Sequence, residues 1–477
     1  MSQRDSTERE RTTGGGANRR VEPSEADPTR PGAADQRLTG DRTVNASRAT
    51  PRTEDADDAA AEAADVATPI TNSTLDMLAD RIGDSDHVLL GEATHGTSQF
   101  YQLRAQLSAK LVQDHGFSFV AVEGDWTDCY QVNRYVTGER DGLDAVLESF
   151  DRWPRWMWAN WEVRRFADWL RDYNADRYDP IGFYGMDVYS LFESMAAVVD
   201  YLESVDPEAA ARARDAYHCF SPYGENAREY ARSTRFTPDS CRDEVLQILT
   251  DLRARATDYG AVDGESFFAA EINALVAKNA EEYYRAMVDA DVESWNVRDE
   301  HMTETIDLLA EHHDGGKAIV WAHNSHVGDA RATDMVDHGR VNLGQLLRER
   351  HDDVSIVGFG THHGSVVAGS EWGAPHESMR VPPAREGSYG DVFHRADLGD
   401  SLLFADDVPA DGPLAGPRGQ RAIGVVYHPD RDWGNYVPTT LPSRYDAFLH
   451  VDESSSLHPL GDSDGSAVSP EAYPWGL

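Results

Sequence analysis

Short apolar runs, each followed directly by polar residues, are the feature of this sequence that most limits its possible folds. Their continuous apolar character is typical of strands buried on both faces, and helical patterns lie between several of them. Such a sheet needs helices on both sides. We therefore expect a three-layer α/β fold, with a mainly parallel central sheet flanked by helices. The runs are HVLLGE (87–92), SFVAVEGD (118–125), IGFYGMD (181–187), KAIVWAHNSH (317–326), VSIVGFG (354–360), RAIGVVYH (421–428) and DAFLHVDE (446–453).

The pattern changes between about 190 and 312, where long helical stretches replace the apolar runs. Because a strand-like run resumes at Lys317, we interpret this region as an all-helical insertion within one α/β domain, residues 69–455. Residues 1–68 are nearly free of large aliphatic and aromatic side chains, so they cannot bury enough apolar surface to offset their ordering entropy. We expect a disordered polar tail there and a short C-terminal tail at 456–477.

The acidic balance of the chain excludes several classes of partner. Its 477 residues include 84 Asp and Glu against 44 Lys and Arg, a formal net charge of −40. An acid-rich, lysine-poor surface suits solubility at high salt, where repulsion between carboxylates is screened. Nucleic acid requires a basic footprint, so we expect no nucleic-acid partner. We predict a halophile-type cytoplasmic protein.

Neither membrane insertion nor secretion is indicated by the sequence. No stretch approaches the roughly 18 apolar residues of a membrane span, and the N-terminus lacks the apolar region of a secretory signal. The cysteines Cys129, Cys219 and Cys241 are irregularly spaced and form no CxxC motif. We therefore predict neither a disulfide framework nor a thiolate zinc site.

Polar side chains collect at the same end of four predicted strands. Because ligands bind in the crevice outside the carboxyl ends of parallel strands, we expect these groups to meet at one site. Each has an ordinary explanation when taken singly, such as a turn role for His95, a buried ion pair for Glu123 or a helix cap for Asp187. The occurrence at four strand ends favours a functional site. The groups are Glu92, His95, Glu123, Asp125, Asp187, His323, Asn324 and His326.

The stretch GEATHG (91–96) places a carboxylate three residues before an imidazole, with a glycine on either side as turn punctuation. Glu92 could accept the imidazole N–H of His95 and fix its tautomer, which leaves the other ring nitrogen available as a general base. Arg104, in the helix that follows, could hold a carboxylate or a developing oxyanion. A surface salt bridge is an equally good interpretation of Arg104.

The segment WPRWMWANWEVRRFADWLRDYN (153–174) contains five tryptophans. Core packing explains most of them, but Trp156 stands in the less regular part and could line an apolar ligand cleft. We assign Trp156 to substrate binding together with Trp126, Asp187 and Asn324, which follow the predicted strand ends.

Two adjacent pairs of histidines lie outside these strand ends. They are His312 with His313 and His362 with His363. We expect their side chains to diverge, and we interpret both pairs as loop residues.

Three of these stretches, GEATHG, EGDW and WAHNSHV, together resemble the erythromycin esterase family, and the resemblance covers roughly residues 70–455. It also includes YGMDVYS, NVRDEHMTETI, NLGQLLRER, ESMRVPPAREGSYGDVFH and GVVYHPD. The resemblance implies a hydrolase with an α/β core and helical additions, whose macrolide-inactivating members open a lactone by adding water. It does not imply the substrate, so we predict a small-molecule ester or lactone and leave the macrolide open.

The same resemblance implies catalytic roles. His95 matches the histidine proposed as general base, with Glu92 beside it. In this scheme His95 removes a proton from water, Arg104 or a histidine stabilises the tetrahedral oxyanion, and a histidine protonates the leaving alkoxide. Whether that histidine is His323 or His326 stays open. The matched set is Glu92, His95, Arg104, Glu123, His323 and His326.

Two other functions could use the same residues. His95, Glu123, His323 and His326 could bind zinc or manganese with a water at an open position. The sequence lacks H-E-x-x-H or a comparable signature, and the resemblance implies a reaction without a required metal, so we predict no cofactor. In a non-catalytic protein the histidines could hold haem or another ligand, although a carboxylate-rich rim argues against haem. The oligomeric state is not predicted.

Overall fold

A nine-stranded sheet forms the centre of the molecule. The structure is a computed structural model, which describes residues 53–461 apart from 225, 235–239 and 290. The strand order is β1-β8-β11-β6-β2-β5-β3-β4, and β7 pairs with β6. The six neighbours from β11 to β4 run parallel, β7 and β8 run antiparallel to them, and β1 pairs antiparallel with β8. The strands are β1 Thr68–Pro69, β2 His87–Leu90, β3 Phe117–Asp125, β4 Gly182–Asp187, β5 Lys317–Trp321, β6 Val354–Gly369, β7 His376–Val381, β8 Ser401–Phe404 and β11 Ala447–Ser454.

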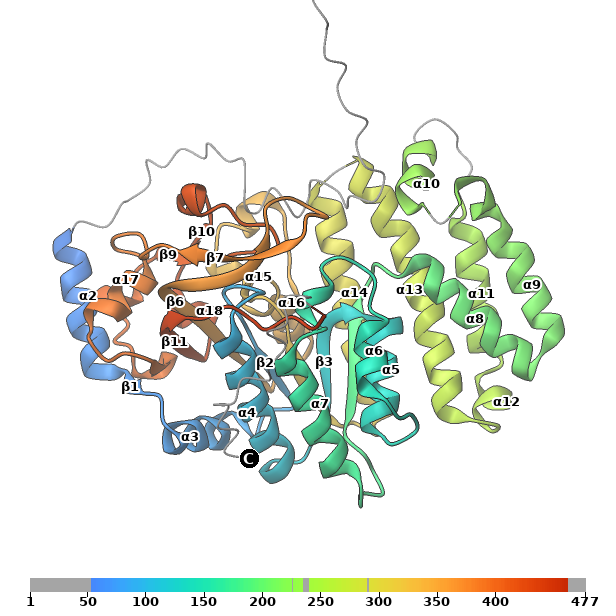
Figure 1. Cartoon of the computed structure of the whole chain (residues 1–477), viewed down its shortest axis with the longest axis horizontal. Coiled ribbons are helices and arrows are strands. Elements are labelled where there is room, and N and C mark those ends of the chain that lie inside the picture. The colour runs from blue at the N-terminus through green and yellow to red at the C-terminus, as the bar shows by residue number, and fades with distance from the viewer. Residues whose placement is uncertain (1–52, 225, 235–239, 290, 462–477) are drawn as a thin grey trace, which may run out of the picture.

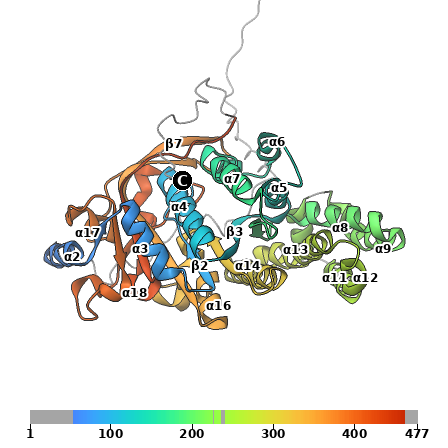
Figure 2. The same cartoon turned by 90° about the horizontal axis from the view of Figure 1, so that it is seen from below.

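Helices cover both faces of this sheet, as Figures 1 and 2 show. Val88 and Leu90 face one hydrophobic cluster and Leu89 faces the other, because side chains alternate along a strand. The predicted three-layer, mainly parallel α/β fold is confirmed. On the first face lie α3 Asn72–Ile82, α4 Ser98–Asp114, α6 Leu143–Glu148 and α7 Trp161–Asn174; on the second lie α2 Thr53–Val66, α16 Leu343–Arg350, α17 Tyr389–Arg395 and α18 Leu441–Arg444.

The described residues between β4 and β5 form helices joined by short loops and no strand, which confirms the predicted helical insertion. Its first helices form a separate hydrophobic cluster at one end of the molecule (Figure 1). Its last two helices also pack on the sheet, through Ile272, Met302 and Ile306. The insertion therefore brings side chains to the sheet itself. The helices are α8 Leu191–Val205, α9 Pro207–Tyr217, α10 Ala227–Thr234, α11 Arg242–Ala254, α12 Ala256–Gly260, α13 Gly264–Asp289 and α14 Asp291–His312.

Both predicted tail boundaries are wrong. Helix α2 lies inside the segment predicted to be disordered, and its Ala59 and Ala63 are fully buried. Alanine packs closely at a helix surface, whereas the prediction considered only large apolar side chains. At the other end, Leu457 is buried and the carbonyl of His458 accepts the backbone N–H of Trp161 at 2.9 Å. The remainder of both predicted tails lies outside the described residues.

The predicted strand RAIGVVYH is also wrong. Arg421 ends β9 Arg418–Arg421, which pairs with β10 Tyr436–Thr439 in a separate two-stranded sheet. The rest of the run crosses the end of the main sheet, and Ile423 bridges to Thr94. The run is apolar because it is buried at that edge, which has the same sequence signature as a buried strand.

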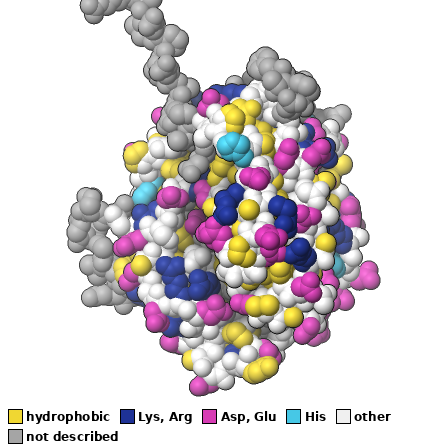
Figure 3. Space-filling model, turned by 90° about the vertical axis from the view of Figure 1, so that its right-hand side faces the viewer, with side chains coloured by type: hydrophobic (Ala, Val, Ile, Leu, Met, Phe, Trp, Pro, Cys, Tyr) yellow, Lys and Arg dark blue, Asp and Glu magenta, His cyan; other side chains and the backbone are white. Residues whose placement is uncertain are grey.

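A disulfide links Cys219 and Cys241 within the insertion, so the prediction of no disulfide was wrong. Spacing alone did not reveal it because the insertion folds the two cysteines together. Disulfides are uncommon in cytosolic proteins, so this bond counts against the predicted cytoplasmic location. Over the part of the chain that the structure describes, no helix is both long and apolar enough to span a bilayer. Acidic side chains are spread among Lys and Arg side chains over the end formed by the insertion (Figure 3).

Candidate active site

The polar residues that follow β2, β3 and β5 lie together at one edge of the sheet. The backbone N–H of Asn324 donates to the Glu92 carbonyl at 2.9 Å, and the backbone N–H of His323 donates to Oε2 of Glu123 at 2.8 Å. The rings of His95 and His323 lie 4.9 Å apart between centroids. Three segments that are far apart in the sequence therefore form one cluster.

Close packing explains the two glycines of GEATHG. A Cβ on Gly91 would lie 2.2 Å from Oδ1 of Asn324, and a Cβ on Gly96 would lie 1.9 Å from the Val367 carbonyl oxygen. Neither glycine is among those with positive φ. The turn after β2 is thus pressed against its neighbours, which holds His95 in a fixed place.

Arg104, Glu92 and His95 form a chain of contacts. Nδ1 of His95 lies 2.8 Å from Oε1 of Glu92, whose Oε2 lies 2.8 Å from Nη2 of Arg104. Arg104 is fully buried in α4, with its guanidinium over the rings of Tyr101 and Trp321. The surface salt bridge considered for Arg104 is therefore wrong. Arg104 holds the Glu92 carboxylate, and Glu92 in turn orients the imidazole.

Arg298, which sequence analysis missed, organises the other half of the cluster. It lies in α14 and donates to both carboxylate oxygens of Asp187, at 2.9 and 2.7 Å, and to Oε1 of Glu123 at 2.7 Å. Although burial raises the pKa of Glu123, His326 and Arg298 lower it well below its ordinary value. The only signal was the stretch NVRDEHMTETI, whose position inside a helical insertion gave no reason to expect contact with the sheet.

His326 is enclosed by charged partners. Its Nδ1 lies 2.9 Å from Oδ1 of Asp299, and its Nε2 lies 3.0 Å from Nη1 of Arg298 and 3.4 Å from Oε1 of Glu123. The ring stacks on Trp295 with centroids 4.6 Å apart. Burial lowers the pKa of His326, but Asp299 and Glu123 raise it above its ordinary value. Both ring nitrogens are thus engaged within the protein.

His323 has a different environment. It caps the short helix α15 Asn324–Val327, where its Nδ1 accepts the backbone N–H of Ser325 at 3.2 Å. A nitrogen that accepts a backbone N–H carries no proton, so the neutral ring is protonated on Nε2. Burial, with His95 nearby, lowers the pKa of His323 well below its ordinary value. Nε2 is buried, no described side chain accepts from it, and the ring also interacts with the Ala93 backbone. His323 is therefore a neutral N–H donor beside His95.

The four residues predicted to bind substrate have mainly structural environments, and for Asp187 this is the bidentate pair with Arg298. Trp126, the first residue of α5 Trp126–Val136, is fully buried and stacks on Tyr130 and Tyr184, on the second face of the sheet. Trp156 is buried in the first cluster. Asn324 bonds the backbone of Phe359 through both side-chain atoms, at 2.7 and 3.2 Å.

The six predicted catalytic residues are all buried in this structure. His95 is the most exposed of the six predicted catalytic residues at 7%, and Arg104 is the least at 0%. A cavity of about 610 Å³ lies elsewhere, beside β6, β7 and β11, and none of the six lines it. His95, at 7%, is slightly more exposed than His323 and Glu123, at 5% each.

The chain has an α/β fold with a histidine–carboxylate cluster at one edge of its sheet, and sequence comparison shows its family. The family model described as erythromycin esterase matches residues 112–454, well over half of the chain. The chain therefore belongs to the erythromycin esterase family and is an ester hydrolase. The matched range begins after Arg104, so Glu92 and His95 lie outside it.

Individual relatives are distant in sequence but cover most of the chain. The erythromycin esterase type II of Escherichia coli is 22% identical over 404 residues, which cover 78% of this chain and 91% of that protein. A solved Bacillus cereus protein has a TM-score of 0.72 at 19% identity, and covers 84% of this chain and 98% of its own. A solved succinoglycan biosynthesis protein has a TM-score of 0.68 at 22% identity, and the match covers 86% of this chain and 100% of that protein. The solved structure of an erythromycin esterase mutant in its open conformation has a TM-score of 0.60 at 17% identity. The match covers 81% of this chain and 95% of that protein. These structures establish the shared fold.

Proposed function

We propose that this protein hydrolyses an ester or lactone of a small molecule, with His95 as the general base that activates water. The chain of contacts from Arg104 through Glu92 to His95 carries the proposal. Because Nδ1 of His95 is held by a carboxylate, Nε2 is the proton-accepting atom, and the negative charge of Glu92 stabilises the imidazolium that forms. Arg104 keeps the carboxylate in place and has no direct role in the reaction.

The neutral ring of His323 supplies the complementary group. Its Nε2–H can donate to the oxyanion of a tetrahedral intermediate, because a neutral donor fixed in advance stabilises charge only as it develops. His323 is a poor acid for the leaving group, since its pKa is lowered and its proton is already in use as a donor. We therefore assign protonation of the leaving alkoxide to His95, which returns the proton taken from water.

The second half of the cluster holds this pair in position. Glu123 uses Oε2 to bind the backbone of His323 and Oε1 to bind Arg298. His326 joins the same network through Asp299 and Arg298. We assign Glu123 and His326 as positioning residues, which narrows the six residues implied by the resemblance to two that contact substrate.

We also propose that the reaction needs no metal in this cluster. A zinc or manganese ion held by His95, Glu123, His323 and His326 would have to compete with the guanidinium of Arg298. That group donates to Glu123 at 2.7 Å and lies 3.0 Å from Nε2 of His326. A fixed positive charge beside two of the four ligands disfavours a divalent cation. The same enclosure of His326 argues against an axial haem ligand.

The substrate is proposed only as a class. The name of the Escherichia coli relative indicates erythromycin for that protein, and at 22% identity we propose a small ester or lactone without naming a macrolide. The net charge of −40 favours an enzyme that acts at high salt. Assays in concentrated KCl are therefore the appropriate condition.

Hydrolysis of an ester and lactone panel in concentrated KCl, monitored by proton release, tests the proposed base. We expect His95→Ala to lower kcat by about 10³-fold, within the range of general acid–base contributions. His338→Ala, at an exposed histidine bonded to the Asp334 carbonyl, is the control and should leave turnover unchanged. Wild-type turnover in His95→Ala would exclude His95 as the base.

A further inference from the structure

Four metal-ligating side chains from three elements converge beside the sheet, outside the candidate active site. His362 and His363 lie on β6, His394 lies on α17 and Asp452 lies on β11. One potential ligand atom from each lies within 4.8 Å of all the others. The interpretation of His362 and His363 as diverging loop residues was therefore wrong, because both belong to a strand and their Nδ1 atoms are 3.0 Å apart.

We propose that His362, His363, His394 and Asp452 bind a divalent transition-metal ion, with zinc the best match. Three imidazole nitrogens and one carboxylate oxygen are a donor set typical of zinc, whereas calcium and magnesium prefer oxygen ligands alone. Ligand bonds of about 2.0–2.1 Å in a tetrahedron place neighbouring ligand atoms roughly 3.4 Å apart. The distances here, 3.0 Å between the first two nitrogens and 2.8 Å from His394 Nδ1 to Asp452 Oδ1, are close to that spacing.

The surroundings of the cluster favour a site built to hold an ion. The rings of His362 and His394 are stacked 3.8 Å apart and parallel, so one ring must rotate before both can direct a nitrogen lone pair at the same ion; the His394 side chain is 45% exposed and has room to do so. His450, fully buried, lies with Nε2 3.4 Å from the same Oδ1 of Asp452. In metal sites, a ligating carboxylate is commonly held in place by a hydrogen bond from a residue that does not itself bind the metal, and His450 can do this for Asp452. The hydroxyl of Ser454 bonds the His363 carbonyl at 3.1 Å and ties the two strands together.

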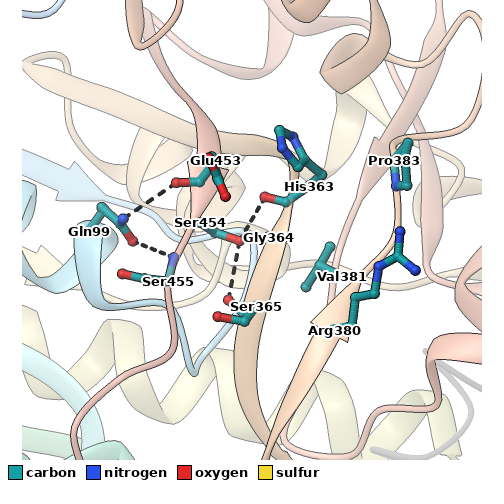
Figure 4. Close-up of a pocket in the computed structure, with 10 residues that line it drawn as sticks. All are labelled: Gln99, His363, Gly364, Ser365, Arg380, Val381, Pro383, Glu453, Ser454 and Ser455. Carbon is teal, nitrogen blue, oxygen red and sulfur yellow. Dashed lines mark hydrogen bonds between the residues drawn. The ribbon is translucent and has the colours of Figure 1, made fainter.

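An ion can reach these residues from solvent. The side chain of His394 is 45% exposed and that of Asp452 is 24% exposed. His363 also lines the cavity of about 610 Å³, together with Gln99, Arg380 and Ser454 (Figure 4). The site is thus open on two sides, in contrast to the enclosed carboxylates around Arg298.

Cobalt and zinc titrations of the full chain test the proposal. The protein is stripped with a chelator, returned to concentrated KCl to screen weak binding to its acidic surface, and titrated with Co²⁺ under visible absorption and Zn²⁺ under calorimetry. We expect one equivalent to bind, with the intense visible bands of four-coordinate Co²⁺. The double variant His394→Ala with Asp452→Asn should weaken binding at least tenfold, since loss of outer contacts alone costs about 10–100-fold.

Two control variants distinguish this site from metal binding elsewhere on the protein. His338→Ala removes an exposed histidine outside both clusters and should bind the metal like wild type. His95→Ala combined with His323→Ala should also retain one equivalent, whereas a metal in the candidate active site would be lost. Circular dichroism confirms that each variant is folded, and Asp452→Asn alone serves if the double variant is not. Unchanged affinity in the folded His394 and Asp452 variants, or absence of stoichiometric binding to wild type, would overturn the proposal.

Discussion

The two halves of the candidate site are built in different ways. Arg104, Glu92 and His95 come from thirteen consecutive residues and form one line of contacts that ends on the imidazole of His95. The half around Arg298 draws on β3, β4, α14 and α15, and its histidine is closed off by Asp299. We call residues 92–104 the local half, because their contacts lie close together in the sequence, and the residues around Arg298 the assembled half. The local half presents the imidazole of His95, and the assembled half supplies a rigid support. Substitutions should therefore affect turnover in the first half and stability in the second.

The largest expected effect is on stability, from removal of Arg298. Arg298→Met leaves two buried carboxylates, Asp187 and Glu123, without their shared cation, and should lower the free energy of unfolding by about 3–5 kcal/mol. Arg104→Met is the matched variant, because it also removes a buried arginine but leaves only Glu92, which keeps its contact with His95. Denaturant unfolding in KCl measures both. An equal or larger loss in Arg104→Met would break the proposed contrast.

The same contrast explains which parts could be predicted from sequence. The pairing of Glu92 with His95 was readable because the residues are three apart in a strand-end turn. Arg298 was not readable, because it reaches the sheet only through the packing of α14 against β4 and β5. Likewise, the convergence of His362 with His394 depends on how α17 lies on β6, which sequence spacing does not specify.

In the fold as well, features set by a short segment could be predicted from sequence, whereas features set by packing between distant segments could not. The parallel strands were predictable from continuous apolar runs such as residues 87–90, which are buried on both faces. The run 421–428 is similarly apolar, but beyond Arg421 it crosses the edge of the main sheet and pairs with it only through isolated bridges. Helix α2 was missed because its burial depends on alanines that contact α17. The apolar pattern of the sequence thus predicts which segments are buried, but the element that covers each segment is known only from the tertiary structure.

The next largest effect concerns turnover. Glu92→Gln keeps a hydrogen-bond acceptor but removes the charge that stabilises the imidazolium, so kcat should fall about 10²-fold, as expected when a catalytic group is misplaced. Glu123→Gln is the matched change in the assembled half and should mainly lower stability, with kcat reduced less than about tenfold. Steady-state kinetics on the best substrate, with unfolding curves for both variants, make the comparison. A greater loss of kcat in Glu123→Gln would show that the assembled half takes part directly in catalysis.

The smallest effect concerns Asp125 and Asp128, two carboxyl groups that follow Glu123 in the sequence and lie near Arg152. Just beyond Glu123, burial raises the pKa of Asp125 to about 6, and burial together with Asp125 raises the pKa of Asp128 to about 7. A carboxyl whose pKa is higher in the folded state stabilises the fold below its unfolded value near 3.8. That contribution is lost as the pH rises through about 7.

Asp128→Asn should therefore raise the free energy of unfolding by about 1 kcal/mol at pH 8 and have little effect at pH 4.5. Asp144→Asn is a control of opposite sign, because the hydrogen bond from Arg164 lowers the pKa of Asp144. Its contribution is present above about 3.8 and lost on acidification, so this variant should not be stabilised at pH 8. Unfolding curves at the two pH values measure both changes. If Asp128→Asn had the same effect at pH 4.5 and 8, the Asp128 carboxyl would not titrate between these values, and Arg152, whose Nε lies 2.5 Å from Oδ2 of Asp125, would already compensate both carboxylates.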